Sequence, residues 1–269
     1  MSEHTRAGRA AMLEAITPVL LTFNEEANIG RTLSRLTWGK DIVIVDSGST
    51  DQTLAIASQF PQVRVSHRAF DSHARQWQFA TGQTDIRTPW ILRLDADYDL
   101  SEELIAEVSL LDADAPVSAY RIAFDYAIYG RKLRSSLYPP NTVLLRTGRF
   151  SIQDGGHTER WTIDGRIENL SGRITHDDRK PLSHWLASQQ RYAKKEVDYL
   201  MTMPRENVSR AGRLRLMGWA APLLVFFYVL FVKRCVLDGW PGWFYALQRL
   251  MAETMIALEV VDRRVRRTS

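Results

Sequence analysis

Four short apolar runs, alternating with segments of helical patterning, dominate residues 16–100 of this chain and constrain its fold most strongly. The runs cover residues 16–23, 41–46, 63–66 and 89–94. The second run is β-branched and almost continuous, as expected for a strand covered on both faces. Between the runs, helical patterns cover residues 28–36, 52–59 and 71–82. This order predicts an α/β fold, with a mostly parallel sheet, right-handed crossovers and helices on both faces.

Beyond residue 100 the pattern changes. Residues 101–110 are predicted to form a helix with Ser101 as its cap. Residues 118–174 have the character of short strands and loops, including strands at 120–129 and 141–146. A further helix is predicted over residues 181–201.

Polar residues follow three of the predicted strands. They are Thr22-Phe23-Asn24-Glu25, Asp46-Ser47 and Asp95-Ala96-Asp97. Because ligands bind at the carboxyl ends of the strands in open α/β sheets, we expect these groups to meet in one crevice. The alternative is that they are carboxylates of solvated loops.

Asp95 and Asp97 are two residues apart, so in an extended chain their side chains project to the same side. Two carboxylates on one side suit a hard divalent cation, Mg²⁺ or Mn²⁺, shared with substrate phosphates. The glycine-rich motifs of dinucleotide oxidoreductases and P-loop NTPases do not occur in the sequence. Neither do the serine elbow of esterases and the His-Glu-x-x-His of zincins, so these classes are disfavoured.

The basic residues are concentrated at the end of the chain. Residues 204–269 hold 11 basic and five acidic side chains, a net charge of +6, whereas residues 1–203 hold 24 and 26, a net charge of −2. Hydrophobicity also rises there, which favours an anionic membrane surface as the partner and disfavours nucleic acid. The single cysteine, Cys235, favours a reducing compartment, and no secretory signal is expected in the first twelve residues.

Residues 216–232 form an uncharged stretch of 17 residues that reaches about 25 Å as a helix, short of the roughly 30 Å hydrocarbon core. We expect Pro222 to kink it. Basic and aromatic residues flank the stretch: Arg205, Arg210, Arg213, Arg215, Lys233, Arg234, Trp219, Trp240 and Trp243. After a turn at 239–242, a second helix is predicted over residues 243–261. We favour a monotopic hairpin over a true membrane span, and the alternative is a hairpin packed against the protein's own sheet.

Three segments, Thr-Phe-Asn-Glu (22–25), Asp-Ser-Gly-Ser-Thr-Asp-x-Thr (46–53) and Leu-Asp-Ala-Asp (94–97), resemble the donor-binding signatures of glycosyltransferase family 2. Later segments resemble the branch of lipopolysaccharide-core β-glucosyltransferases: Gly156-His157-Thr158-Glu159-Arg160, His176, Trp185 with Arg191-Tyr192-Ala193, and residues 237–242. The resemblance covers about residues 16–250. It implies the GT-A nucleotide-sugar fold and inverting transfer.

The resemblance also implies roles for the residues at the strand ends. Donor binding is expected at Thr22, Phe23, Asn24, Glu25, Asp46, Ser47, Gln76, Asp95 and Asp97. Glu25 and Asp46 would contact the nucleoside, Asp97 would bind the Mg²⁺ or Mn²⁺ that bridges the diphosphate, and Asp95 would support the ribose or the metal. The sequence departs from the branch at Tyr98, where Glu is frequent, and at Gln78, where Asn is common; these departures bear on the identity of donor or acceptor.

Glu159 is the candidate general base, since inverting transfer requires one carboxylate that takes the proton of the acceptor hydroxyl. The alternative is a surface ion pair with Arg160 or Arg166. His176 is a candidate metal ligand or else a structural histidine. Candidate contacts to the acceptor or to phosphate are His157, Arg179, Lys180, Arg191 and Tyr192. For Arg191 and Tyr192 the alternative is a helix face packed on the sheet.

These observations predict a leader at residues 1–15, a catalytic domain at 16–203 and membrane-associated helices at 204–269. Within the catalytic domain, residues 16–100 form the donor-binding half and residues 101–203 the acceptor half. The predicted enzyme is a metal-dependent inverting glycosyltransferase that uses a nucleotide-diphosphate sugar, with UDP as the expected nucleotide, and a membrane-anchored glycan acceptor. Its expected location is the cytoplasmic face of the inner membrane, peripheral or monotopic. The alternatives are a nucleotidyltransferase and a catalytically silent scaffold that binds nucleotide sugars.

Overall fold

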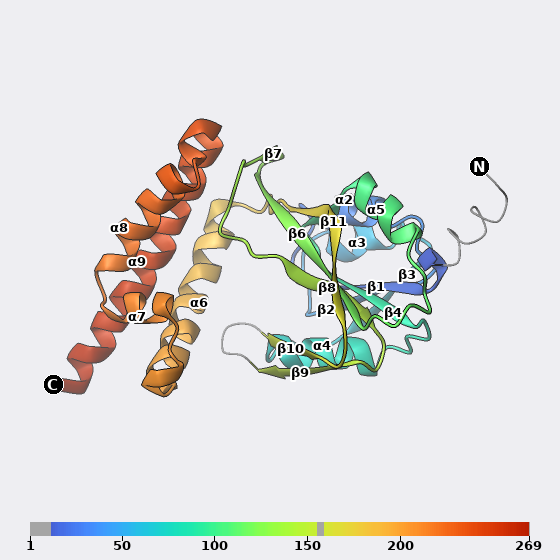
Figure 1. Ribbon diagram of the computed structural model, residues 1–269, viewed down its shortest axis with the longest axis horizontal. Coiled ribbons are helices and arrows are strands. Elements are labelled where there is room, and N and C mark those ends of the chain that lie inside the picture. The colour runs from blue at the N-terminus through green and yellow to red at the C-terminus, as the bar shows by residue number, and fades with distance from the viewer. Residues whose placement is uncertain (1–11, 155–158, 269) are drawn as a thin grey trace. The chain divides into compact units, whose positions relative to one another are not determined.

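The computed structural model describes residues 12–154 and 159–268 (Figure 1). The chain divides into two compact units. The first contains the residues up to Tyr129 together with Tyr138–Arg179, and the second contains Gly130–Leu137 and the residues from Lys180 onward. From Lys180 onward the chain thus belongs to the second unit, whereas the sequence predicted that the catalytic domain extends to residue 203.

The first unit is built on a mixed sheet. Its strands lie in the order β3 (Val63–His67), β2 (Ile42–Asp46), β1 (Ile16–Thr22), β4 (Trp90–Asp95), β8 (Asn141–Arg146), β6 (Ala119–Ile128), β11 (Ile167–His176) and β5 (Tyr98–Leu100). The first four are mutually parallel, as predicted for residues 16–100. β8 runs antiparallel to both β4 and β6, and β5 runs antiparallel to β11. The sheet is therefore mixed: its four neighbouring parallel strands come from the first hundred residues, and β6 and β11 form a further parallel pair.

Helices cover both faces of this sheet because the strand side chains alternate between two cores. Leu20, Ile42 and Ile44 enter the core under α2 (Ile29–Ser34), α3 (Thr53–Ala57) and α5 (Glu102–Ser109). Val19, Val43 and Val45 face the opposite way, toward α4 (His73–Gly82). The Ser101 hydroxyl accepts a hydrogen bond from the Leu104 amide at 3.1 Å, which confirms the predicted cap of α5.

A separate two-stranded sheet, β9 (Phe150–Asp154) with β10 (Glu159–Ile163), lies against α4 (Figure 1). The Gln78 side chain donates to the Ile152 carbonyl at 2.8 Å. The rings of Trp77 and Trp161 meet edge to face, with centroids 5.6 Å apart. Because an isolated two-stranded sheet is marginally stable in water, these contacts with α4 are needed to hold the hairpin in place.

The second unit is helical after the short strand β7 (Arg131–Lys132). Its elements are α6 (Leu182–Thr202), the 3₁₀ turn η1 (Arg205–Asn207), α7 (Arg210–Leu216), α8 (Ala220–Phe227), the π-helical turn η2 (Tyr228–Val232), the 3₁₀ turn η3 (Cys235–Asp238) and α9 (Trp240–Thr268). A core of Ala193, Val197, Ile256 and Val260 joins α6 to α9. Of the helices that the structure describes, none combines the length and the apolar character needed to cross a bilayer.

The expected kink at Pro222 is absent because residues 216–232 do not form one continuous helix. α7 ends at Leu216, and Gly218 has a φ of +80°, a conformation that favours glycine. α8 starts two residues later, so Pro222 lies in its first turn. Backbone amides there lack intrahelical partners in any case, and proline is tolerated.

An ion-pair cluster of a half-buried arginine and two buried carboxylates holds three helices of the second unit together. Arg215 of α7 contacts Glu196 of α6 at 2.8 Å and Glu253 of α9 at 2.6 Å. The two carboxylates raise the pKa of the Arg215 guanidinium. Arg215, counted above among the basic residues that flank the apolar stretch, is therefore an internal cross-link between helices.

The segment Gly130–Leu137 is anchored within the second unit by residues that follow it much later in the chain. Arg134 pairs with Asp238 at 3.1 Å, and the Leu137 amide donates to the Tyr245 hydroxyl at 2.9 Å. The Cys235 thiol donates to the Ser135 carbonyl at 3.4 Å.

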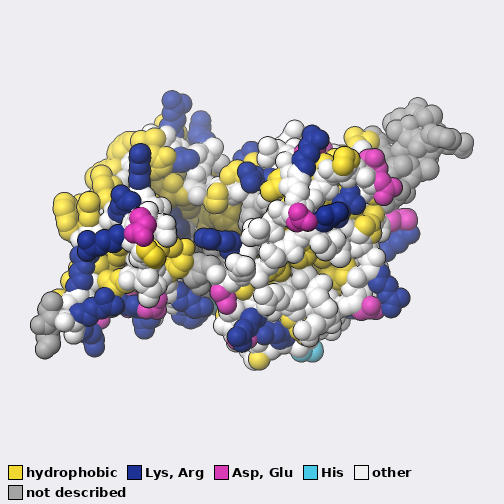
Figure 2. Space-filling view, turned by 60° about the horizontal axis from the view of Figure 1, so that its bottom comes forward, with side chains coloured by type: hydrophobic (Ala, Val, Ile, Leu, Met, Phe, Trp, Pro, Cys, Tyr) yellow, Lys and Arg dark blue, Asp and Glu magenta, His cyan; other side chains and the backbone are white. Residues whose placement is uncertain are grey.

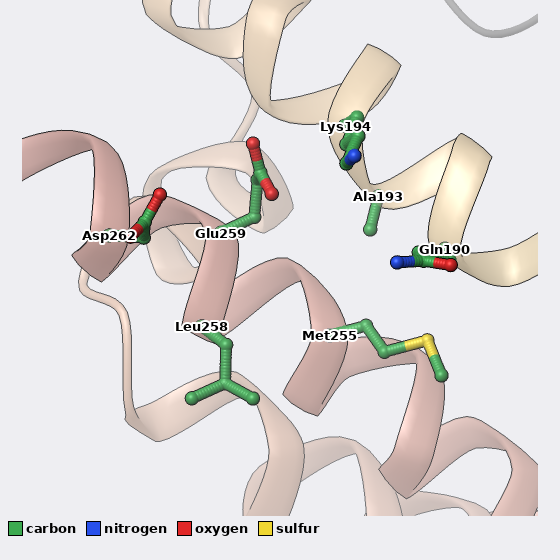
Figure 3. A pocket seen from close by; sticks show the side chains of 7 residues that line it. All are labelled: Gln190, Ala193, Lys194, Met255, Leu258, Glu259 and Asp262. Carbon is green, nitrogen blue, oxygen red and sulfur yellow. The ribbon is translucent and has the colours of Figure 1, made fainter.

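A small groove lies between α6 and α9, with a cavity volume of about 240 Å³ (Figure 3). Its lining mixes apolar and charged side chains, and consists of Gln190, Ala193, Lys194, Met255, Leu258, Glu259 and Asp262. None of the predicted site residues belongs to this lining.

Candidate active site

The carboxyl ends of three parallel strands bring the predicted polar groups to one edge of the sheet. Thr22 at the end of β1 is paired with Asp46 at the end of β2. On the other side of β1, Leu21 is paired with Asp95 at the end of β4. The expected convergence of these strand ends is confirmed.

The loops that follow β1 and β2 are connected by hydrogen bonds. The Asn24 amide donates to the Ser49 hydroxyl at 2.9 Å, and the Thr50 amide donates back to the Asn24 side-chain oxygen at 2.8 Å. The Glu25 amide donates to the Thr53 hydroxyl at 2.7 Å. Asn24 has a φ of +54°, a left-handed conformation that asparagine tolerates better than most residues. The two loops therefore form one polar platform.

The Asp46 carboxylate holds this platform in place through hydrogen bonds. Its side chain is fully buried, and one oxygen accepts from the Gly48 and Ser49 amides at 2.9 and 2.8 Å. The other oxygen accepts from the hydroxyls of Thr22 at 3.0 Å and Ser49 at 2.5 Å. Both carboxylate oxygens are thus engaged within the chain.

Gln76 supports Ser47 from α4. Its side-chain nitrogen donates to the Ser47 hydroxyl at 2.8 Å and to the Arg68 carbonyl at 2.9 Å, and its oxygen accepts from the Arg68 guanidinium. Arg68 also binds both oxygens of Asp71, at 2.8 and 2.9 Å, and this holds the pKa of Asp71 well below its usual range. Phe23, in contrast, leaves about half of its side chain exposed next to these polar groups.

Asp97 lies beside His176, with Oδ2 and Nε2 separated by 3.5 Å. The pairing of β5 with β11 places His176 opposite Tyr98. His176 also stacks on the ring of Tyr126, at 4.9 Å between centroids, and contacts Tyr138 at 4.8 Å. Burial raises the pKa of Tyr138, so this phenol stays neutral.

Asp95 and Asp97 differ in their surroundings. Their side chains would share one side only in an extended chain, but Ala96 and Asp97 form a turn. Asp95 is exposed, whereas Asp97 is buried. In the part of the chain that the structure describes, no three His, Cys, Asp or Glu side chains are grouped as a metal site. The adjacent carboxylate and imidazole of Asp97 and His176 nevertheless have the donor chemistry that suits Mn²⁺ or Mg²⁺.

A second set of contacts, which the sequence did not indicate, links Glu25 to the segment that follows β11. The Asn28 side-chain nitrogen donates to Glu25 and to Asp178, at 3.0 Å each. Its oxygen accepts from the Arg179 amide at 3.0 Å. The Arg179 side chain pairs with Asp177 at 2.8 Å. No recognisable motif marks Asn28, because Asp178 and Arg179, the partners that follow β11, are about 150 residues away.

Glu159, the first residue of β10, is held by one of its two carboxylate oxygens. Oε1 accepts from Arg93 at 2.8 Å and from the Trp161 indole at 3.1 Å. Its ion-pair partner is therefore a buried arginine of β4 and neither Arg160 nor Arg166; Arg166 pairs with Glu168 at 2.6 Å. Sequence reasoning missed Arg93, although a charge inside a buried strand is a signal that it has a partner.

The family model described as "Glycosyl transferase family 2" matches residues 18–163, more than half of the chain. The chain is a family 2 glycosyltransferase. It is similar to the lipopolysaccharide core biosynthesis glycosyltransferase LpsC of Rhizobium meliloti, with 29% identity over 195 residues that cover 68% of this chain and 70% of LpsC. An uncharacterized glycosyltransferase of Rickettsia felis is 35% identical over 102 residues, 38% of this chain and 35% of that protein.

Among solved structures, this family 2 glycosyltransferase is similar to S. aureus TarS 1-349 in complex with UDP-GlcNAc. The identity is 16% and the TM-score 0.49, over 92% of this chain and 91% of TarS 1-349. The family match and the mixed sheet, with polar groups at the ends of its parallel strands, agree with the GT-A fold expected from the sequence.

The remaining predicted residues of this glycosyltransferase are distributed over both units. Arg179 is the last residue of the first unit, and Lys180, Arg191 and Tyr192 belong to the second. Arg191 and Tyr192 are exposed on α6, where Arg191 donates to the Ser188 hydroxyl at 3.0 Å. His157 lies outside the described residues. The roles of these residues stay predictions.

Proposed function

We propose that this enzyme moves a sugar from a nucleoside-diphosphate sugar, with UDP as the nucleotide, to a hydroxyl of a membrane-anchored glycan, with inversion at the anomeric carbon. The observation that carries the proposal is the convergence of Thr22, Asp46 and Asp95 at one edge of the parallel sheet. In α/β folds this edge is where nucleotides bind. The similarity to LpsC supports an acceptor of the lipopolysaccharide-core type, and a capsule precursor is the alternative acceptor.

The platform formed by the loops after β1 and β2 would receive the nucleoside. Its backbone is fixed by Asp46 and by the bonds between Asn24 and Ser49. The exposed ring of Phe23 offers a flat apolar surface, and Glu25 offers carboxylate acceptors. Gln76 holds Ser47 in place, and Thr22 holds Asp46. Each of these residues thus has either a direct or a supporting part in donor binding.

Asp97, Asp95 and His176 would hold the divalent cation. Bound there, Mg²⁺ or Mn²⁺ would neutralise the negative charge of the diphosphate and stabilise it as a leaving group. The aromatic rings around His176 keep the imidazole beside Asp97.

Glu159 acts as the general base in this proposal. The acceptor O–H bond breaks and its proton passes to the Glu159 carboxylate. The acceptor oxygen forms a bond to the anomeric carbon, while the bond between that carbon and the diphosphate oxygen breaks and its electron pair leaves with the nucleotide. A single displacement inverts the configuration, so one base is sufficient. His157, Arg179, Lys180, Arg191 and Tyr192 are proposed contacts to the acceptor or to phosphate.

Product analysis tests this proposal. The full-length protein is incubated with a panel of nucleotide sugars and Mn²⁺, with and without a lipid extract that supplies the acceptor. We expect release of UDP together with a glycosylated lipid whose new linkage has the inverted anomeric configuration by NMR. Release of pyrophosphate would identify a nucleotidyltransferase, and donor binding without any product would identify a silent scaffold.

We further propose that the second unit binds the anionic phospholipid surface of the cytoplasmic leaflet. Large apolar side chains are exposed on and beside α8, η2 and α9: Met217, Trp219, Leu223, Leu224, Phe227, Phe231, Val232, Trp240, Trp243, Leu247, Met251 and Leu258. Lys233 and Arg234 follow directly after η2. Figure 2 shows apolar side chains gathered over these helices, with basic side chains around them. Apolar burial combined with nearby positive charge is what an anionic bilayer surface accepts.

A further inference from the structure

Arg93 is a buried cation in the middle of the main sheet. It belongs to β4, which lies between β1 and β8, and its side chain is only 7% exposed. Nε donates to the Thr142 carbonyl at 2.9 Å, and Nη1 donates to Glu159 Oε1 at 2.8 Å. Because desolvating a guanidinium is costly, the folded protein has to retain these two partners.

Two indole rings enclose the guanidinium. The Arg93 Cζ lies 4.6 Å from the centroid of the Trp161 ring and 5.9 Å from that of Trp77. Trp161 also donates its indole N–H to Glu159 Oε1 at 3.1 Å. The arginine and the tryptophan therefore restrict the same carboxylate oxygen from two directions.

We propose that Arg93 is a positioning residue, which fixes the Glu159 carboxylate so that Oε2 receives the proton of the acceptor hydroxyl. This inference rests on the proposed role of Glu159 as the base. Within residues 12–154 and 159–268, no hydrogen-bond donor is found on Oε2, whereas Oε1 has two. Two fixed bonds to one oxygen define the orientation of the whole carboxylate and leave the second oxygen for the substrate.

The same contact also fixes the strand that carries the base. Glu159 begins β10 in the two-stranded sheet, which is separate from the main sheet. The ion pair from β4 to β10 ties this hairpin to the most central part of the fold. Since a small displacement of a reacting group lowers the rate strongly, we expect the loss of Arg93 to affect turnover more than donor binding.

The test compares three single variants of the full-length enzyme. Arg93→Met removes the charge and the donors, and Arg93→Lys keeps the charge but loses the two-pronged geometry. Arg146→Met is the matched control. Arg146 also stacks on an indole, with Cζ 4.6 Å from the Trp90 ring centroid. It donates to the backbone carbonyls of Val117, Ala113 and Ala115 and to no carboxylate of the described residues. Nucleotide release gives kcat and the donor KM, and thermal unfolding gives Tm.

We expect Arg93→Met to lower kcat by at least about tenfold, with the donor KM within about twofold of wild type. Arg93→Lys should recover part of the lost kcat. Arg146→Met should lower Tm to a similar degree and leave kcat close to wild type. In the double variant Arg93→Met/Glu159→Gln, kcat should be no lower than in Glu159→Gln alone, because Arg93 acts through Glu159.

Several results would overturn the inference. They are an unchanged kcat in Arg93→Met, equal losses of kcat in Arg93→Met and Arg146→Met, or losses that multiply in the double variant. If Arg93→Met does not fold, Arg93→Lys is measured in its place. A wild-type kcat in Arg93→Lys, with the same kcat loss from Glu159→Gln whether or not Arg93 is replaced, would then overturn the inference. Wild-type turnover in Glu159→Gln would instead refute the base assignment, so the two failures are distinguishable.

Discussion

The Thr22 hydroxyl donates a hydrogen bond to the Asp46 carboxylate at 3.0 Å, and the same two residues are paired across β1 and β2. The last residue of one strand thus fixes the last residue of its neighbour through backbone and side chain together. From there Asp46 also holds the Gly48 and Ser49 amides. The shape of the proposed nucleotide platform depends on this buried carboxylate.

Replacing Asp46 with Asn should therefore weaken donor binding. The amide nitrogen of Asn cannot accept a hydrogen bond, so either the backbone amides or the hydroxyls lose a partner, at a cost of about 1–3 kcal/mol. We expect UDP affinity, measured by calorimetric titration, to fall by about tenfold or more. Ser58→Ala is a suitable control, because Ser58 is exposed just after α3 and its hydroxyl donates to the Ala55 carbonyl, its one partner among the described residues. Equal affinity of Asp46→Asn and wild type would contradict the platform model.

Chelation of divalent cations should abolish transfer. Asp97 and His176 supply a carboxylate and an imidazole that suit Mn²⁺ or Mg²⁺, so removing the cation leaves the diphosphate charge without compensation. Asp97→Asn should have the same effect with a nearly unchanged Tm. Nucleotide release in excess EDTA, before and after Mn²⁺ is restored, is the measurement. Full activity in excess chelator would exclude a metal-dependent mechanism.

Glu159→Gln retains the size and the hydrogen-bonding capacity of the side chain but loses the proton acceptor. We expect turnover to fall by roughly 10²–10⁴-fold, the range typical for removal of a general base. UDP affinity should stay within about twofold, since Glu159 would face the acceptor. Single-turnover assays and UDP titrations measure the two quantities separately. A variant that fails because it no longer binds the donor would show that Glu159 has a different role.

Vesicle sedimentation tests the membrane proposal. The full-length protein should bind vesicles that contain anionic phospholipid, and binding should persist in part at high salt because the apolar contribution is not screened. Omitting the anionic lipid should weaken it, by about 1 kcal/mol for each interfacial Lys or Arg.

Paired substitutions separate the two contributions to vesicle binding. Trp219→Ser with Phe231→Ser, at positions 74% and 60% exposed, should reduce binding at all salt concentrations. Lys233→Gln with Arg234→Gln should reduce it at low salt only. Leu110→Ser, at a 58% exposed position of the first unit, is the matched control and should bind as wild type does. Protein that remains in the supernatant with every vesicle composition would contradict the proposal.

The buried thiol of Cys235 should make the stability of the protein depend on pH. Burial raises the pKa of its thiol to about 11, above the ordinary value of 9.0. The native protein should therefore resist alkylation by iodoacetamide at pH 8 and react at once in denaturant. A pKa raised on folding contributes stability that is complete below pH 9 and is lost as the pH rises toward 11. Urea unfolding of wild type and Cys235→Ala measures this effect. The difference in their free energies of unfolding should become smaller, to the detriment of wild type, between pH 8 and pH 10.5.

The sequence predicted best what depends on local patterning. The parallel strands around residues 16–22, 42–46, 63–67 and 90–95 and the cap at Ser101 follow from apolar runs and capping chemistry over a few residues. Pro222 was misjudged because Gly218 divides the uncharged stretch before the proline is reached. Length and polarity alone did not reveal this break.

Contacts between distant residues could not be predicted in the same way. Arg93 and Glu159 are 66 residues apart, and Arg215 pairs with residues 19 and 38 positions away. A charge inside a buried strand indicates that Arg93 has a partner, but nothing in the sequence identifies that partner, and only the folded chain brings such pairs together. The motifs marked Glu159 and Asp97 as candidates, but the residues that orient them lie on other elements.

The segment Gly130–Leu137 belongs to the second unit, and this has a consequence for the synthesis of the chain on the ribosome. Asp238 and Tyr245, which bind Arg134 and Leu137, follow them by 104 and 108 residues. Because the ribosome adds about 5–20 residues per second, this segment is synthesised roughly 5–20 s before its partners are. A chain cut near Pro204 would never supply them, and it would also lose Ile256 and Val260, the partners of Ala193 and Val197 on α6. Shortened forms of the enzyme meant to remove the apolar helices should therefore end before α6 and replace residues 130–137 with a brief polar turn.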